Sequence, residues 1–266
     1  MNLDIKQEIK NIVLKTKNLN STFTKKHPNT KYTLDEIIDE IIYFMKSGVS
    51  YRMLRSPINY KTLHYYYSLF VKNNVFYKLF NKIRNVYLKK YIHVDDNCSL
   101  YIDSTIINNK YGVNKVGRNK FYKNKKSTKI SLMTDKNGFP LSILFMKGNY
   151  HDNKVFEKHI RDAIVLLPNK NLKIITDKAY SSKKNYLLLK SKNIGHIIPP
   201  RRNMKMAKTY TYDKNEYKKR TKIENIFSRL KMNRKFSFRY EKYLRNFVGF
   251  VYLAFSFIAI NIIKSY

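Results

Sequence analysis

The chain has 266 residues, enough to bury a core in one large domain or in two smaller ones. It carries 54 Lys and Arg residues against 18 Asp and Glu residues, and the formal net charge of +36 is spread along the sequence. This charge favours a polyanionic partner, with DNA or RNA first and an anionic membrane surface second. The single cysteine, Cys98, excludes an intrachain disulfide and a cysteine-based zinc cluster, so we expect a reducing compartment.

The first third of the chain has the periodicity of amphipathic helices. Helices are expected over residues 2–17, 34–47, 60–72 and 75–91. The charged first segment is unlike a secretory signal, and the polar residues 18–31 are expected to be a linker. Short helices with tight breaks and basic side chains are typical of helix-turn-helix units. We therefore expect residues 1–92 to form an all-α DNA-binding domain, with an ordinary helical bundle carrying solvated lysines as the alternative.

From residue 99 the pattern changes to short strands alternating with helices. Strands are expected over residues 99–103, 130–135, 141–147, 172–176 and 193–199, and helices over residues 153–167, 181–192 and 217–231. An Asn-Gly turn joins the second and third strands into a hairpin. This order predicts an α/β fold over residues 93–266, with a mixed sheet flanked by helices.

Two acidic residues are expected at the ends of strands in this sheet. Asp103 ends the first strand and Asp177 ends the fourth. Open α/β sheets place their site residues beyond strand ends, although isolated Asp residues there also serve as turn formers. Their combination with a third acid, in a chain poor in acids, favours a shared site.

The third acid is Glu224, within the expected helix over residues 217–231. Tyr217, Arg220, Glu224 and Lys231 have the spacing Y-x2-R-x3-E-x6-K, and on a continuous helix they share an arc of about 60°. One carboxylate would then lie among two cations and a phenol, an arrangement suited to an acid that binds a metal beside bases that bind phosphate. The alternative is a surface helix with incidental ion pairs between residues four apart.

Two further segments have a composition that stands out. The loop over residues 110–129 is rich in Lys, Arg and Asn with interleaved aromatics, and includes Arg118 and Lys120. We expect it to contact the DNA backbone, with a mobile solvated hairpin as the alternative. The tail over residues 247–263 is the most apolar stretch but is near the lower length limit for a membrane span. A core helix or a dimer contact is favoured.

In combination these motifs resemble a DDE transposase, nearest to the insertion-sequence groups four and five. The resemblance rests on Asp103-Ser104-Thr105, on Asp177-Lys178-Ala179-Tyr180 and on the Tyr217/Arg220/Glu224/Lys231 pattern. The segment DKNGFPLSILFMKGNYHD also resembles the family's block between the first two acids. The similarity covers roughly residues 34–263, and departs from the family in having no tryptophan. It implies a ribonuclease-H-like catalytic core preceded by a helical DNA-binding domain.

The resemblance also implies the chemistry of the site. Asp103, Asp177 and Glu224 would be the catalytic residues and would hold two Mg²⁺ or Mn²⁺ ions, which prefer oxygen ligands. Such a pair of ions activates water or a DNA 3′-hydroxyl and stabilises the leaving oxygen. Tyr180 is expected to be a packed aromatic residue, because no covalent protein–DNA intermediate is needed.

The remaining positions of the resembling motifs are expected to assist. Arg220 and Lys231 would clamp phosphate, and Tyr217 would contact the DNA backbone or pack. His151 and Asp152 follow the third strand and are expected to orient the metal ligands without touching the metal themselves.

Other functions share parts of this pattern. A captured, non-catalytic DNA binder would keep the basic surfaces, and a ribonuclease-H-like nuclease would keep the acids without strand transfer. A basic membrane-surface protein is the last alternative. For a transposase we expect double-stranded DNA, comprising inverted repeats and target, as the partner, at least a homodimer in the active complex, and no membrane. The compartment would be the cytoplasm or nucleoid of a bacterium, or a host nucleus or viral replication compartment if the source is viral or eukaryotic.

Overall fold

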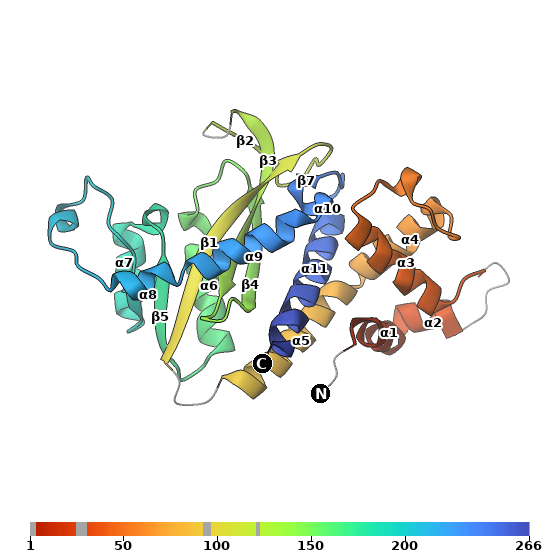
Figure 1. Cartoon of the computed structure of the whole chain (residues 1–266), viewed down its shortest axis with the longest axis horizontal. Coiled ribbons are helices and arrows are strands. Elements are labelled where there is room, and N and C mark those ends of the chain that lie inside the picture. The colour runs from red at the N-terminus through yellow and green to blue at the C-terminus, as the bar shows by residue number, and fades with distance from the viewer. Residues whose placement is uncertain (1–3, 25–30, 93–96, 121–122, 266) are drawn as a thin grey trace. The chain divides into compact units, whose positions relative to one another are not determined.

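The computed structural model describes residues 4–24, 31–92, 97–120 and 123–265. The chain divides into two compact units, which are described separately. Unit 1 comprises residues 1–86, 110–114 and 230–266, and unit 2 comprises residues 87–109 and 115–229. Figure 1 shows the elements of both units, coloured from the N-terminus to the C-terminus.

Unit 1 is mostly helical. Its elements are α1 (Ile5–Lys15), α2 (Lys17–Thr24), α3 (Leu34–Ser47), η1 (Tyr51–Met53), α4 (Tyr60–Lys72), most of α5 (Val75–Tyr91), the last turn of α9 (Thr221–Met232), α10 (Arg234–Ser237), β7 (Phe238–Arg239) and α11 (Leu244–Lys264). The predicted bounds of α3, α4 and α5 are confirmed. Thr33 forms a capping box with Glu36 at the start of α3, and Gly48 ends the helix with a φ of 65°. The expected linker is wrong in part, because its first residues belong to α2; residues 25–30 lie outside the described part.

The apolar tail forms α11, which packs among the N-terminal helices of unit 1. The rings of Tyr67 and Phe250 stack with their centroids 4.0 Å apart, and the Tyr67 hydroxyl donates a hydrogen bond to the backbone oxygen of Asn246. Gly249 permits this approach, because a Cβ there would lie 2.5 Å from Cγ2 of Val71. Among the described residues α11 is long and apolar enough to cross a membrane, and 67% of that stretch is buried in the structure. Because residues 230–266, including α11, belong to unit 1, the two compact units do not coincide with the domains expected on either side of residue 92.

Unit 2 contains the sheet. Its elements are the end of α5, then β1 (Asn97–Asn109), β2 (Gly117–Asn119), β3 (Lys125–Thr134), β4 (Pro140–Lys147), α6 (Asn153–Leu166), β5 (Asn171–Thr176), η2 (Lys178–Tyr180), α7 (Lys183–Ser191), β6 (Gly195–Ile197), η3 (Lys205–Lys208), α8 (Lys214–Lys218) and most of α9. The strand order is β2-β3-β1-β5-β6, with β4 also paired to β3. β1 pairs antiparallel with β3 and parallel with β5. This mixed sheet with flanking helices confirms the expected α/β class.

The first strand is longer than its sequence indicates. β1 continues to Asn109 because residues 101–108 pair with Thr134 through Ser127 of β3. The expectation that Asp103 ends this strand is therefore wrong: Asp103 lies in its middle, opposite Leu132. The basic loop after β1 is correspondingly shorter than expected, since β2 and the start of β3 occupy part of it.

Adjacent residues of β1 face the two sides of the sheet. Ser104 pairs with Ser131 of β3, and the Ser131 hydroxyl lies 2.9 Å from Nε2 of His159 on α6. Because neighbouring strand residues point to opposite faces, Asp103 faces the other side, where Arg220 precedes α9. α6 and the first turns of α9 therefore cover opposite faces of the sheet (Figure 1).

His159 is fully buried between α6 and the sheet. Its two ring nitrogens lie within hydrogen-bond distance of Ser131 and Ser142, at 2.9 and 3.0 Å. Burial lowers the pKa of His159 from 6.5 to about 3. The neutral ring is thus part of the folded core.

This burial predicts a pH-dependent loss of stability. The pKa of His159 is lower in the folded protein than in the unfolded chain, so the unfolded chain takes up the proton first as the pH falls. The free energy of unfolding is therefore highest above about pH 6.5 and decreases toward pH 3. Between pH 7 and pH 4 the wild type should lose about 3 kcal/mol more unfolding free energy than His159→Gln. Urea titrations at both pH values measure the difference. Equal losses in the two proteins would contradict this account.

Candidate active site

The register of two parallel strands brings the first two acids together. Ile102 of β1 lies opposite Thr176 of β5, so the residues that follow them, Asp103 and Asp177, are neighbours across the two strands. Asp177 immediately follows β5, as expected, and its Oδ1 accepts a hydrogen bond from the backbone amide of Ala179 at 2.9 Å. Asp103 Oδ1 accepts one from the amide of Ser104 at 2.8 Å.

Arg220 connects the first acid to the third. Its Nη1 donates to Oδ2 of Asp103 at 3.0 Å, and its Nη2 donates to Oε1 of Glu224 at 2.5 Å. The side chains of Asp103 and Arg220 are mostly buried, whereas that of Glu224 is 48% exposed. One planar guanidinium thus bridges two carboxylates, a geometry that an ammonium group does not reproduce.

The carboxylates also act on one another electrostatically. The pKa of Asp103 is raised to about 6, mainly by burial and to a smaller extent by the nearby charges of Asp177 and Glu224. The backbone amide of Ser104 and the guanidinium of Arg220 oppose this rise. Negative charge is therefore concentrated around one cation.

The helix expected over residues 217–231 is interrupted. α8 ends at Lys218 and α9 begins at Thr221, with Arg220 in the turn between them. The amide of Arg220 donates to the Tyr217 oxygen, and that of Ile223 to the Arg220 oxygen, each at 3.1 Å; these bonds span three residues, so the chain turns more tightly than an α-helix. The shared helical face expected for all four motif residues is therefore wrong.

Tyr217 still lies beside Arg220, although the two residues do not share one continuous helix. The guanidinium carbon of Arg220 lies 5.8 Å from the centroid of the Tyr217 ring, and Tyr212 packs edge-on against the same ring. Arg220 and Glu224 keep their spacing of four residues. Lys231 lies in the last turn of α9, and burial lowers its pKa.

The donor set of this cluster suits a hard divalent cation. Three carboxylates without sulfur or imidazole match the preferences of Mg²⁺ and Mn²⁺, and a cation would relieve the excess negative charge at Asp103. Within the described residues, no group of three His, Cys, Asp or Glu side chains lies close enough to hold a metal ion as arranged here. The guanidinium of Arg220 is the positive charge between Asp103 and Glu224 instead.

His151 contacts Arg201, a residue that the sequence did not single out, and Arg201 in turn binds the loop after Asp177. Nε2 of His151 lies 2.9 Å from Nη2 of Arg201, and Arg201 donates to the backbone oxygen of Ala179 at 3.0 Å. Arg201 belongs to a segment interpreted only as a basic loop. The run of prolines and arginines there was its one signal.

Asp152 and Tyr180 support the site from within unit 2. Asp152 forms an ion pair at 3.0 Å with Lys129 of β3, which is buried and also donates to the backbone oxygen of Tyr150. Tyr180 is buried, with its hydroxyl 3.1 Å from that of Ser104, as expected for a packed aromatic residue.

The sequence of the whole region identifies its family. Residues 96–262 match the family model described as the transposase DDE domain, which is more than half of the chain. The chain belongs to the transposase DDE domain family. No curated protein is significantly similar to it in sequence.

Three solved structures similar to this family member come from transposases. The piggyBac transposase synaptic complex with hairpin DNA is 14% identical, with a TM-score of 0.43 over 74% of this chain and 49% of that one. The Mos1 transposase paired-end complex with left transposon end is 11% identical, with a TM-score of 0.28 over 86% and 79% of the two chains. The catalytic domain of Mos1 mariner transposase is 10% identical, with a TM-score of 0.28 over 71% and 91%. The present chain spans about half the length of the piggyBac chain.

Arg118 and Lys120, two of the predicted phosphate contacts, lie on and just after β2 and do not belong to the carboxylate cluster. Arg118 is in β2, which pairs with the start of β3 opposite Lys126, and Lys120 follows β2. Both side chains are exposed. They form a basic edge of the sheet, and the cluster itself consists of the three acids, Arg220 and Tyr217.

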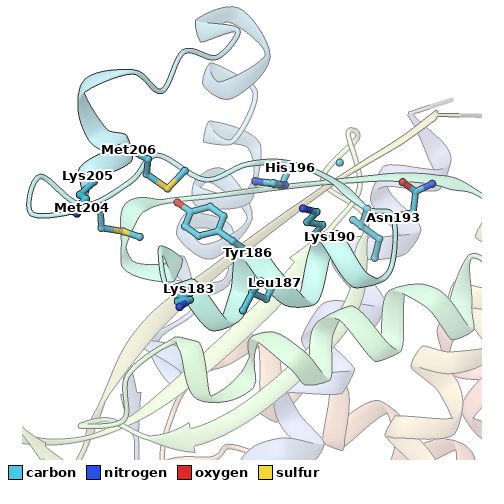
Figure 2. A pocket seen from close by; sticks show the side chains of 11 residues that line it. Lys183, Tyr186, Leu187, Lys190, Asn193, His196, Met204, Lys205 and Met206 are labelled. Carbon is cyan, nitrogen blue, oxygen red and sulfur yellow. The ribbon is translucent and has the colours of Figure 1, made fainter.

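A pocket of about 930 Å³ in unit 2 contains none of the three carboxylates. It lies between α7, β6 and the turn at Met204, and Figure 2 shows the Tyr186 ring in it, with the side chains of Lys183, Lys190 and Lys205 around it. The lining is largely apolar with a basic rim. The three carboxylates of the predicted site therefore lie outside this pocket.

Proposed function

We propose that this chain is a transposase that binds the ends of a DNA element, cuts the DNA and joins the freed 3′ ends to target DNA. The observation that carries the proposal is the convergence of Asp103, Asp177 and Glu224 on one side of the sheet, around Arg220, in a chain of the DDE family. The net charge of +36 supports a nucleic-acid substrate.

The three carboxylates would be the ligands of two Mg²⁺ or Mn²⁺ ions. When bound, such ions activate the attacking water or 3′-hydroxyl and stabilise the leaving oxygen at a scissile phosphate. The backbone amides of Ser104 and Ala179 each hold one carboxylate in place. The burial of Asp103 excludes water and strengthens its interaction with any cation.

We propose that Arg220 exchanges its carboxylate partners for a DNA phosphate when DNA is bound. In the cluster its guanidinium is bound by Asp103 and Glu224. If those carboxylates held a metal, the forked guanidinium of Arg220 would be available for two oxygens of a DNA phosphate. Tyr217, packed against the guanidinium, limits its movement, and Lys231 adds a cation on the same helix as Glu224.

His151 and Asp152 act as positioning residues in this proposal. His151 contacts Arg201, which binds the backbone just after Asp177. Asp152 neutralises the buried Lys129 of β3, the strand that pairs with the strand of Asp103. Residues 1–92, together with Arg118 and Lys120, would bind the DNA backbone. We also propose that the active complex is at least a homodimer, since two DNA ends must be paired. Its compartment would be the bacterial cytoplasm or nucleoid, or a host nucleus or viral replication compartment, and no membrane is needed.

A cleavage assay on DNA carrying the flanking element ends tests the proposal. Cutting at the ends should require Mg²⁺ or Mn²⁺ and stop with chelator, and joined products should appear when target DNA is added. Metal-dependent cutting without joining would leave a nuclease. Tight, salt-sensitive binding without cutting would leave a captured DNA binder and would overturn the proposal.

A further inference from the structure

Unit 1 contains a pocket of about 950 Å³ whose lining belongs to unit 1 alone. It lies between the segment after α3, His64 of α4, and the chain from α10 to the start of α11. Nδ2 of Asn233 donates to the backbone oxygen of Met45 at 2.8 Å, so the cap of α10 is fastened to the end of α3. Gly48 fits against Arg234, because a Cβ there would lie 3.0 Å from the Arg234 Cβ. The pocket is therefore a built feature of the unit.

Aromatic rings form much of its wall. Tyr111, Phe238, Tyr240 and Tyr243 line the pocket and are exposed. The rings of Tyr111 and Tyr240 are 6.1 Å apart, and Tyr111 is 69% exposed. Exposed aromatic faces of this kind serve as stacking platforms for unpaired bases, since every base has a π-face.

The floor holds a buried ion pair among aromatic rings. Nζ of Lys235 lies 3.4 Å from Oε1 of Glu241, and the two side chains are only 6% and 7% exposed. The same ammonium lies 3.5 Å from the centroid of the Phe44 ring. A desolvated pair of this kind contributes little net stability, and it places fixed charges next to the aromatic rings of the pocket.

The polar groups of the lining present unused hydrogen-bonding capacity. Oε2 of Glu241, the hydroxyl of Tyr51 and Oδ1 of Asn246 are buried and have no hydrogen-bond partner. Two of these atoms are obligate acceptors, so a ligand that satisfies them must donate N–H or O–H groups. Arg234 and Lys242 add positive charge to the lining, which suits a phosphate.

We propose that this pocket binds an unpaired nucleobase, with guanine preferred, stacked on the exposed ring of Tyr111 and hydrogen-bonded toward Glu241 and Asn246. Guanine has neighbouring ring N–H and amino donors on one edge, whereas thymine has a single ring N–H between two carbonyl acceptors. The cations of the lining would take the adjoining phosphate. The site is distinct from the carboxylate cluster of unit 2 and does not depend on cleavage.

Nucleoside binding to the full chain tests this proposal without the non-specific attraction of phosphate to a basic protein. Saturation-transfer NMR titrations with guanosine and thymidine at about 0.3 M salt should give a guanosine Kd about 10-fold lower than that of thymidine. Tyr111→Ala should weaken guanosine binding about 10-fold by removing one stacking face. Tyr65→Ala is the matched control, because Tyr65 is a 58% exposed tyrosine of the same unit that does not line the pocket.

Three outcomes would overturn the proposal. Equal affinity for both nucleosides would remove base recognition, and unchanged binding in Tyr111→Ala would place the ligand elsewhere. Binding of inorganic phosphate or an acidic peptide without either nucleoside would assign the pocket to anions. Because Tyr111 is exposed, its loss is not expected to unfold the chain, and a circular dichroism melt checks this for both variants.

Discussion

Replacing Asp103 with asparagine is expected to reduce DNA cleavage about 10³-fold while changing the free energy of unfolding by less than about 1 kcal/mol. The loss of activity follows from the removal of a proposed metal ligand whose charge no neighbour replaces. The small effect on stability follows from the surroundings of Asp103. Burial and the charges of Asp177 and Glu224 already raise its pKa to about 6, so asparagine relieves repulsion and keeps an acceptor for the Ser104 amide. Single-turnover cleavage and urea unfolding measure the two effects.

Asp135→Asn is the matched control for this prediction. Asp135 is also a buried aspartate of unit 2 whose pKa is raised by burial, but it accepts hydrogen bonds from the Tyr87 hydroxyl at 2.5 Å and from the amides of Asn137 and Phe139. Its loss should lower the free energy of unfolding by about 1–2 kcal/mol and leave the cleavage rate of the folded fraction unchanged. Normal cleavage by Asp103→Asn, or equal losses of activity in both variants, would remove Asp103 from the chemistry.

The elements predicted most accurately are those with local boundaries. The bounds of α3 follow from Thr33 and Gly48, since a cap and a left-handed residue act within one turn. The hairpin of β3 and β4 follows from its Asn-Gly turn in the same way. Neither signal depends on the rest of the chain.

The errors arise where pairing across the chain decides the structure. β1 extends beyond Asp103 because β3 supplies partners up to Asn108. The β-branched run Thr105–Ile107 is consistent with this, but it was not interpreted as part of the strand. Asp103 and Asp177 are neighbours because Ile102 pairs with Thr176, and the register of parallel strands is set by the sheet rather than by a turn. The sequence therefore indicated residues that lie near one another in the structure, but with the wrong local geometry.

The placement of α11 has the same kind of cause. Its apolar composition is plain from the sequence, but its partner is not. Gly249 and the stacking of Tyr67 on Phe250 select the N-terminal helices, and both are properties of two surfaces together. Arg201 had only the run of prolines and arginines as a signal, because its role depends on His151, fifty residues earlier in the chain.

Replacing Arg220 with glutamine is expected to lower the Mg²⁺ concentration that gives half-maximal cleavage, by about threefold or more, and to lower the maximal rate about 10²-fold. The first effect follows because the guanidinium competes with metal for Asp103 and Glu224, which it binds at 3.0 and 2.5 Å. The second follows because a forked, charge-assisted contact to phosphate is lost. Arg220→Lys should restore part of the rate, since a single ammonium keeps the charge but cannot bridge two carboxylates. Arg229→Gln, at an exposed position of α9, is the control and should leave both values unchanged. A higher Mg²⁺ requirement in Arg220→Gln would show instead that Arg220 holds the carboxylates in a metal-binding arrangement, and its proposed exchange between carboxylate and phosphate would be wrong.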